Sequence, residues 1–452
     1  MQPSKFLTSF VSVVLSFSLF FSVPTSASAT ESAGANMLQN VVSSVFPNAE
    51  LNANSGSKID NNASLLNESS LSEKFDLRDP NGDGDRSDSL VTSVKLQEPW
   101  GSCWGFASIS AAETSILSRA ASEGKSIDNL DLSELQVVNS VCKNGGAPEK
   151  YVGNDQAGEG YRNETDDPNR HLNEGGWPFF VSNAFACGIG PVKESDAPYK
   201  CREETIKYFV QKKGSLQYSI EVLSSEQVSQ LKLEGATVEK AYYAGNYQDA
   251  SGNNVYTDWT TSDDLWNKSI YEFENSNFLP ETLILKENLR GEKEYAGIDM
   301  NSVKAIKTEL QQSKRAVTCN YVYKEKYYNY DSWTYYNDTY DSNPNHTVTI
   351  VGWDDTISAD SFGGNDGSGA KPEGDGAWLI KNSWGAKVDQ YGNEQTFPNG
   401  QPAKDFGIKE NGQCTGYFWL SYYDRTLSKF ESFDFNLQTT ELSDEFIVDQ
   451  YD

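Results

Sequence analysis

The fold of this chain is decided by the stretch Pro99-Trp100-Gly101-Ser102-Cys103-Trp104-Gly105-Phe106-Ala107. It places a cysteine where a glycine-containing turn runs into small and apolar residues. These residues recur at helical spacing from Ser102 to Arg119, which predicts a buried helix that begins at the cysteine. A thiol at a helix N-terminus lies near unpaired N–H groups and the positive end of the helix dipole, so its thiolate is favoured. The stretch therefore predicts a nucleophile at Cys103.

A thiolate that attacks a carbonyl group needs a base, a group that orients the base, and donors for the oxyanion. The chain has two histidines. His346 stands at the entrance to a predicted strand over 348–353, and a strand end is a rigid platform for an imidazole. His171 lies in a polar loop, where the favoured interpretation is a solvated side chain. We therefore expect His346 to be the base.

Two amide side chains are suited to the remaining roles. Asn382 follows a predicted strand over 378–381, where its oxygen can accept a hydrogen bond from the imidazole, with Trp384 shielding the pair from water. Gln97 lies six residues before Cys103, in the loop that leads into the helix. Its amide can donate to an oxyanion together with the backbone N–H of Cys103.

In this order, Gln–Cys–His–Asn, the residues resemble the papain-like family of cysteine peptidases. The stretches that carry the resemblance are Gln97–Ala107, Leu132–Cys142, Gly175–Pro178, His346–Trp353 and Trp378–Gly385. Two further stretches, Phe75–Arg78 and Phe418–Asp424, resemble the bacterial and archaeal branch that carries a lectin-like insertion. The resemblance covers most of residues 75–201 and 300–425.

The resemblance implies a peptidase that hydrolyses peptide bonds through a thiolate–imidazolium pair and an acyl-enzyme. Cys103 would be the nucleophile and His346 its ion-pair partner and later the general acid. Asn382 would orient His346, Gln97 would contribute to the oxyanion hole, and Trp384 would pack on Asn382. This chemistry requires no cofactor.

Substrate binding and a disulfide are also implied by the resemblance. Gly175 and Gly176 match the cleft glycines that pair with an extended peptide, and Trp384 also lines the cleft. Cys142 and Cys201 match a disulfide of the left lobe. Family members often have a second bridge where this chain has Trp100 and Asn173, so we expect aromatic packing of Trp100 to hold the loop instead. Glu98 stands where a glycine is usual.

The number of cysteines limits the disulfides. An exported protein with six cysteines is expected to form some disulfide bonds. If Cys103 stays a thiol, five others remain: Cys142, Cys187, Cys201, Cys319 and Cys414. Five is an odd number, so at least one more cysteine is expected to be unpaired and buried.

The N-terminal residues have the order of a secretory signal peptide. A lysine at position 5 precedes an apolar run over 11–23 and the small residues Ala27-Ser28-Ala29, which predicts a signal peptide over 1–29. A membrane anchor is the alternative, but the apolar run is short. Residues 30–72, rich in Asn, Ser and Ala, read as a leader or short pro-segment. We expect a protein that is secreted or held at the cell surface, without stable insertion in the membrane.

The net charge of −28 is unfavourable for binding nucleic acid or anionic lipid. One acidic stretch, Asp79-Pro80-Asn81-Gly82-Asp83-Gly84-Asp85, resembles the first half of a calcium loop, with Asp88 as a substitute for the usual last ligand. The calcium candidates are Asp79, Asn81, Asp83, Asp85 and Asp88. The favoured interpretation is an acidic turn that binds no metal.

The predicted fold class is α+β, because helices come first and strands later. Further helices are expected near 131–138, 178–186 and 302–312, and strands over 316–323 and 418–423. We expect a two-lobed papain-like fold: a helical left lobe over 73–201, an inserted, lectin-like module over 202–300, and a β-barrel-like right lobe over 301–452. The tyrosine-rich residues 321–340 are interpreted as a hairpin that packs on the inserted module, the alternative being a sugar- or protein-binding face.

Two other classes of function stay open at this point. The chain could be an adhesion or carbohydrate-binding protein that uses a peptidase scaffold, with cell-surface glycans as partners of the 202–300 module. It could also be a cysteine transpeptidase or a cell-wall amidase. The complete Gln–Cys–His–Asn set favours a peptidase with protein or peptide substrates.

Overall fold

The structure is a computed structural model. It describes residues 71–141, 167–202, 207–214, 219–221, 223–241, 246–248, 253–265, 268–364, 369–389, 393, 395 and 405–438. The predicted signal peptide, all but two residues of the predicted leader, and Cys142 lie outside these ranges. The described residues belong to one compact unit, Ser70–Asp452.

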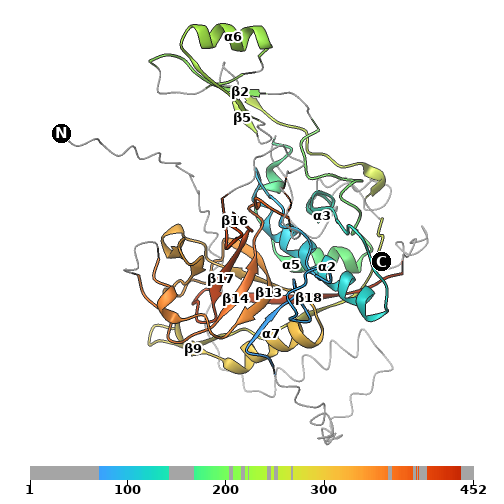
Figure 1. Cartoon of the computed structure of the whole chain (residues 1–452), viewed down its shortest axis with the longest axis vertical. Helices are drawn as coiled ribbons and strands as arrows, with labels where there is room; N and C mark the ends of the chain where they lie inside the picture. The colour runs from blue at the N-terminus through green and yellow to red at the C-terminus, as the bar shows by residue number, and fades with distance from the viewer. Residues whose placement is uncertain are drawn as a thin grey trace, which may run out of the picture. The chain divides into compact units, whose positions relative to one another are not determined.

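Among the described residues, three helices form the first part of this unit, and Figure 1 shows them close together in blue to green. They are α2 (Cys103–Ser122), α3 (Glu134–Val141) and α5 (Pro178–Ala186), and the short 3-10 helix η2 (Arg170–Leu172) precedes α5. Proline at the first position of α5 has a fixed φ that suits a helix start. Helix α2 confirms the helix predicted at Cys103, and it begins at that residue.

A sheet of nine strands dominates the described residues of the second part. In spatial order the strands are β11 (Tyr328–Asn329), β12 (Thr334–Tyr335), β17 (Tyr417–Ser421), β14 (Ala377–Lys381), β13 (His346–Asp354), β10 (Val317–Tyr321), β18 (Ser428–Asn436) and β7 (Glu272–Phe278), while β1 (Lys74–Asp76) also pairs with β13. Pairing is antiparallel except between β12 and β17. The early helices and this sheet confirm the α+β class.

The remaining elements are small. Helix α7 (Met300–Gln312) lies beside β10 and β13, and the 3-10 helices are η3 (Asp263–Leu265), η4 (Glu325–Tyr327) and η5 (Ala359–Ser361). Minor sheets pair β2 (Lys207–Gln211) with β3 (Ser219–Glu221) and β4 (Thr237–Ala241), β5 (Tyr247–Gln248) with β6 (Asn254–Val255), β8 (Leu283–Glu287) with β9 (Lys293–Ile298), and β15 (Lys409–Glu410) with β16 (Gln413–Cys414). Helix α6 (Ser225–Leu233) begins with a capping box at Ser224 and Gln227.

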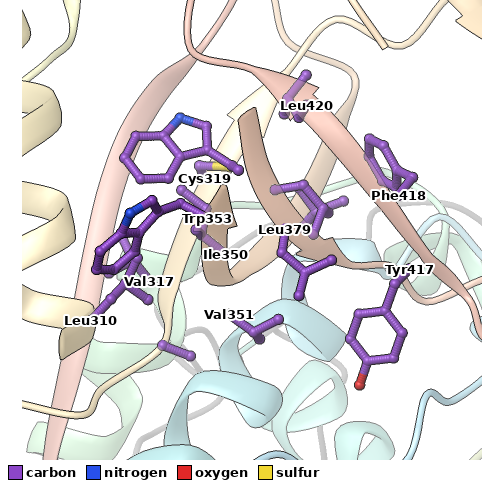
Figure 2. Packing of buried hydrophobic residues seen from close by; sticks show 14 of the residues in the cluster. Leu310, Val317, Cys319, Ile350, Val351, Trp353, Leu379, Tyr417, Phe418 and Leu420 are labelled. Atoms are coloured by element: carbon purple, nitrogen blue, oxygen red, sulfur yellow. The ribbon is translucent and has the colours of Figure 1, made fainter. Parts of the chain in front are cut away.

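One hydrophobic cluster fills the space around the large sheet and α7. Figure 2 shows Leu310 of α7 near Val317 and Trp353, with Leu379, Phe418 and Leu420 supplied by the neighbouring strands. All of these side chains are at most 1% exposed. Burying each one stabilises the fold by roughly 1.5–3 kcal/mol relative to leaving it exposed. This cluster makes β13 and β14, the strands that precede Trp384, a rigid support.

A second cluster packs the three early helices against the end of β18. It contains Ile109 of α2, Val138 of α3 and Phe185 of α5, together with Phe433 and Phe435 of β18. Phe185 meets the rings of Phe433 and Phe435 edge-on, with centroids 6.0 and 5.3 Å apart. Strand β18 therefore contributes to the packing of both the sheet and the helices.

Residues of the 202–300 segment pack against both hydrophobic clusters. Its strand β7 pairs with β18 at the edge of the large sheet, and its residue Trp259 is 1% exposed within the second cluster. The domain boundaries expected from the sequence stay predictions.

The tyrosine-rich residues 321–340 form a hairpin, β11–β12, but its packing differs from the expectation. Tyr321, Tyr328 and Tyr335 are fully buried in the first cluster, among β10, β14 and β17. The interpretation of a hairpin packed on the inserted module is therefore wrong. The ring of Tyr328 lies 5.3 Å from that of Phe418, and its hydroxyl is 3.0 Å from that of Tyr321, so the phenols satisfy one another within the core.

Candidate active site

Cys103 is the first residue of α2 and is 8% exposed. Burial raises the pKa of its thiol, and hydrogen bonds to the sulfur from the backbone and side chain of Thr347 and from the backbone of Trp104 act in the opposite direction. Thr347 is the residue after His346 on β13. Packing of α2 against β13 therefore brings the thiol to the part of the strand that carries the imidazole.

His346 is held by Asn382. The distance from His346 Nε2 to Asn382 Oδ1 is 2.8 Å, and both side chains are buried. The two residues come from neighbouring strands, because β13 begins at His346 and Asn382 directly follows β14. This is the pairing that the sequence predicts for a base and the amide that orients it.

The surroundings of Asn382 determine which nitrogen of His346 carries the proton. The backbone N–H of Ser383 donates to Asn382 Oδ1 at 2.9 Å, so this atom acts as an acceptor. His346 Nε2 must then be the donor of the 2.8 Å hydrogen bond. In the neutral ring, Nδ1 is left as the basic nitrogen.

Trp384 stacks on the imidazole. Its ring centroid lies 4.7 Å from that of His346 with an interplanar angle of 25°, and the indole is half-buried. Burial lowers the pKa of His346 to about 4, while the hydrogen bond with Asn382 acts against this shift. The neutral form of the ring is therefore the favoured one before any charge forms on the cysteine.

Gln97 is fixed at both ends. Its backbone N–H donates to Ser383 O at 2.8 Å, and Ser383 Oγ donates to its side-chain oxygen at 2.7 Å. Its Nε2 donates to Trp100 O at 2.9 Å. An amide group has two N–H bonds, so one remains for a ligand in the cleft.

The two glycines expected in the cleft differ in their surroundings. A Cβ on Gly176 would lie 2.4 Å from the ring of Trp104, so no side chain fits there. Gly175 has a φ of +79° and open space where a Cβ would be. The backbone of Gly175 is thus accessible. Its neighbour Gly176 packs on Trp104, the residue that follows Cys103.

The loop at Trp100 and Asn173 is joined without a covalent bond. The backbone N–H of Gly101 donates to Asn173 Oδ1 at 3.0 Å. The indole of Trp100 is 7% exposed and meets Trp259 edge-on at 5.8 Å. The expected disulfide partner Cys142 lies outside the described residues, so its pairing with Cys201 stays a prediction.

A buried group of charges that the sequence analysis did not single out lies close to this site. Lys95 Nζ is 2.8 Å from Glu134 and 3.5 Å from Glu113. Lys381 precedes Asn382, and burial lowers the pKa of its amine to about 8. Its Nζ donates to Thr92 Oγ1 at 3.0 Å, and Thr92 in turn donates to Glu113. These polar contacts join α2, α3 and β14 beneath the site.

His171 is not the solvated loop residue expected from its polar neighbours. It is 5% exposed, with Nε2 at 2.7 Å from Asn139 Oδ1, and burial lowers its pKa to about 4. The correction has a clear cause, because η2 packs against α3 and covers the ring. His171 is thereby bound to the helical part of the molecule.

The calcium candidates make hydrogen bonds within their own turn. Asp79 accepts from the backbone N–H groups of Asp83 and Gly84, at 3.1 and 3.0 Å, and Asp85 accepts from the backbone of Ser87 at 2.8 Å. Asn81 and Asp88 are hydrogen-bonded to each other. Within the described part of the chain, no group of three or more His, Cys, Asp or Glu side chains is arranged to hold a metal ion. The interpretation as an acidic turn that binds no metal stays a prediction.

The family model described as "Papain family cysteine protease" matches residues 71–248 and 250–412. The chain belongs to this family. The matched family is one of cysteine proteases. No curated protein sequence matches the chain.

Solved structures give weaker matches. The Clostridial cysteine protease Cwp84 after propeptide cleavage is 20% identical, with 76% of this chain and 54% of that chain covered and a TM-score of 0.41. The cysteine protease and lectin-like domains of Cwp84, a surface layer associated protein of Clostridium difficile, are also 20% identical, with 81% and 52% covered and a TM-score of 0.41. The bromelain protease from Ananas comosus is 16% identical, with 80% and 99% covered and a TM-score of 0.37. The chain spans about half the length of the two Cwp84 structures.

In the described residues, no helix combines the length and the apolar character needed to cross a membrane.

Proposed function

We propose that this papain-family protein is an exported endopeptidase in which Cys103 attacks the peptide carbonyl and His346 is the base. The observation that carries the proposal is the hydrogen bond between His346 Nε2 and Asn382 Oδ1 at 2.8 Å. This hydrogen bond leaves Nδ1 of the ring as the proton acceptor. The next residue on the same strand, Thr347, donates to the Cys103 sulfur.

In the first step, the proton of the Cys103 thiol moves to Nδ1 of His346. Burial alone disfavours either charge, since it raises the pKa of the thiol and lowers that of the imidazole. Moving one proton within the pair creates no net charge, so the two new charges stabilise each other. Hydrogen bonds from Thr347 and Trp104 and the dipole of α2 add to the stabilisation of the thiolate.

In the second step, the thiolate forms a bond to the carbonyl carbon and the carbonyl oxygen takes the negative charge. The remaining N–H of Gln97 and the backbone N–H of Cys103 are the proposed donors to this oxygen. Imidazolium gives its proton to the leaving amine as the C–N bond breaks, which produces an acyl-enzyme. Water, deprotonated by His346, then releases the acid and restores the thiol.

The test compares Cys103→Ala with Cys319→Ala, a matched loss of a buried thiol in β10. We expect Cys103→Ala to lower peptide hydrolysis by about 10³-fold or more and to abolish labelling by an epoxide-type thiol-protease inhibitor. Cys319→Ala should keep both properties. Hydrolysis at the wild-type rate by Cys103→Ala would reject the mechanism.

Three finer points need separate experiments. Export is supported by the signal-like residues 1–29, and N-terminal sequencing of protein recovered from the medium would test it. Hydrolysis is distinguished from transpeptidation by product analysis in the presence of a nucleophilic amine. A dominant amide product would favour a transpeptidase.

Glycan binding by residues 202–300 can be tested on a glycan array with Cys103→Ala, which cannot cleave the array's proteins.

A further inference from the structure

The loop from Gln97 to Cys103 is bridged by the phenol of Tyr199. The Tyr199 hydroxyl donates to Gln97 O at 2.8 Å, and it lies 2.6 Å from Ser102 Oγ. A phenol has one proton, and a carbonyl oxygen can only accept, so the hydroxyl of Ser102 must donate to Tyr199. One side chain therefore connects the residue that carries the proposed oxyanion amide with the residue before the proposed nucleophile.

The same bridge explains an unusual helix start. Ser102 is the N-cap residue of α2, but its side chain makes no capping hydrogen bond. A serine at this position usually accepts from a backbone N–H of the first turn. Because Ser102 is directed to Tyr199, it does not compete for the first-turn N–H groups beside Cys103.

The bridge is buried and rigid. Tyr199 is 3% exposed and Ser102 is fully buried, and burial raises the pKa of the phenol well beyond physiological pH, so it stays a donor. The phenol ring meets Phe106 of α2 edge-on at 4.7 Å. The backbone N–H of Tyr199 donates to Glu194 at 2.7 Å, which fixes the residue from a third side.

Trp259 adds a contact from the 202–300 segment. Its indole lies between Tyr199 and Trp100, with ring centroids 5.1 Å from the first and 5.8 Å from the second, both edge-on. Its backbone oxygen accepts from Asn139 Nδ2 of α3 at 3.0 Å. Trp259 therefore supports the middle of the loop while Tyr199 bridges its ends.

We propose that Tyr199 and Trp259 are positioning residues that set the separation of Gln97 and Cys103. This inference rests on the proposed function, because it assigns them an effect on the oxyanion hole. Trp259 belongs to the 202–300 segment, so this segment helps to hold the catalytic loop in place. Both side chains are buried, so the effect we propose acts through the loop.

The test is Tyr199→Phe, which removes the hydroxyl and keeps the ring. We expect kcat for peptide hydrolysis to fall about tenfold with KM unchanged, because the loss concerns the transition state. Affinity for a peptide aldehyde should fall by a similar factor. The thiol adds across the aldehyde C=O, with sulfur bonded to carbon and the proton on oxygen, and this oxygen occupies the oxyanion hole. Alkylation by iodoacetamide, which forms no oxyanion, should keep its rate.

A purely structural role would not separate the aldehyde from iodoacetamide. Tyr422→Phe is the matched control, because Tyr422 is 1% exposed and its hydroxyl donates to Asp355 at 2.8 Å in the other cluster. It should lower thermal stability with kcat unchanged. Ser102→Ala should reproduce the kinetic effect, and the double variant with Tyr199→Phe should be no worse than either single one.

Trp259→Leu should lower kcat in the same direction as Tyr199→Phe. If wild type hydrolyses peptides and Tyr199→Phe matches Tyr422→Phe in kcat and aldehyde affinity, the positioning role is wrong and the proposed function stands. Additive losses in the double variant would also overturn the bridge. If wild-type hydrolysis does not depend on Cys103, the proposed function fails and this inference fails with it.

Discussion

The two histidines of this protein lie in pairs of nearly the same geometry in different regions. His346 Nε2 is 2.8 Å from Asn382 Oδ1 in the sheet, and His171 Nε2 is 2.7 Å from Asn139 Oδ1 among the helices. Both rings are 5% exposed, and burial lowers both pKa values to about 4. The geometry and burial of the pair therefore do not distinguish the proposed base from the other histidine.

The pairs differ in what surrounds them. His346 is followed on its strand by Thr347, which donates to the Cys103 sulfur, and it is stacked on the half-buried Trp384. Asn139, in contrast, also donates to the backbone of Trp259. Under the proposed mechanism, one arrangement serves a reaction in one region and holds a loop to a helix in another.

Replacing the histidines gives the largest expected difference between the pairs. His346→Gln should lower kcat/KM for peptide hydrolysis by about 10³-fold, since the base is lost. His171→Gln should leave kcat/KM within about threefold of wild type. Steady-state kinetics with a fluorogenic peptide measures both. Equal losses in the two variants would contradict the roles assigned to them.

Replacing the asparagines should separate activity from stability. We expect Asn382→Ala to lower kcat by about 10- to 100-fold, because the imidazole loses its orientation. Asn139→Ala should lower the free energy of unfolding by about 1–3 kcal/mol, since the buried hydrogen bonds to His171 and to the backbone oxygen of Trp259 are lost. Kinetics and denaturant unfolding on the same samples check this. A stability loss confined to Asn382→Ala would reverse the comparison.

The third comparison concerns the pH dependence of stability. A histidine whose pKa is about 4 when folded and 6.5 when unfolded stabilises the fold above pH 6.5, and this contribution is lost as the pH falls towards 4. Lowering the pH from 7.5 to 5 should therefore change the stability of wild type relative to His171→Gln by about 2 kcal/mol, in favour of the variant.

The difference between wild type and variant is the quantity to measure here. Burial raises the pKa of Glu194 to about 7 and that of Asp424 to about 6, so these two groups make the folded protein more stable as the pH falls. They act in both proteins, so their contribution cancels in the difference. A difference that does not change between the two pH values would show that His171 is not held in its neutral form.

Much of the site could be predicted from the sequence because it depends on local signals. Small residues after Cys103 indicate a helix start, and apolar runs before Asn382 and after His346 indicate strands; the structure confirms these elements. The order of the four residues then carried the resemblance to the family. Sequence order alone could not show that Thr347 contacts the sulfur, because this depends on how α2 packs on β13.

The errors share another cause, the burial of polar-looking segments. His171 stands among charged residues and the tyrosines of 321–340 among polar ones, yet tertiary packing buries His171 and four of these tyrosines, Tyr321, Tyr328, Tyr335 and Tyr336. Strand β18 was not predicted. Phe430 and Phe433 are three residues apart and pack in different clusters, so the apolar residues of this strand do not follow a single alternating pattern. Tyr199 and Trp259 gave no signal, because their role depends on contacts across long stretches of chain.

Strand β18 has a consequence for the order in which activity can arise during synthesis. Phe430 completes the core around the sheet, while Phe433 and Phe435 complete the core around the helix that carries Cys103. This strand follows all the other described elements along the chain. A ribosome-bound chain that has not yet released residue 428 lacks part of both cores. We therefore expect the nascent protein to gain proteolytic activity late, in one cooperative step after translation has passed this strand.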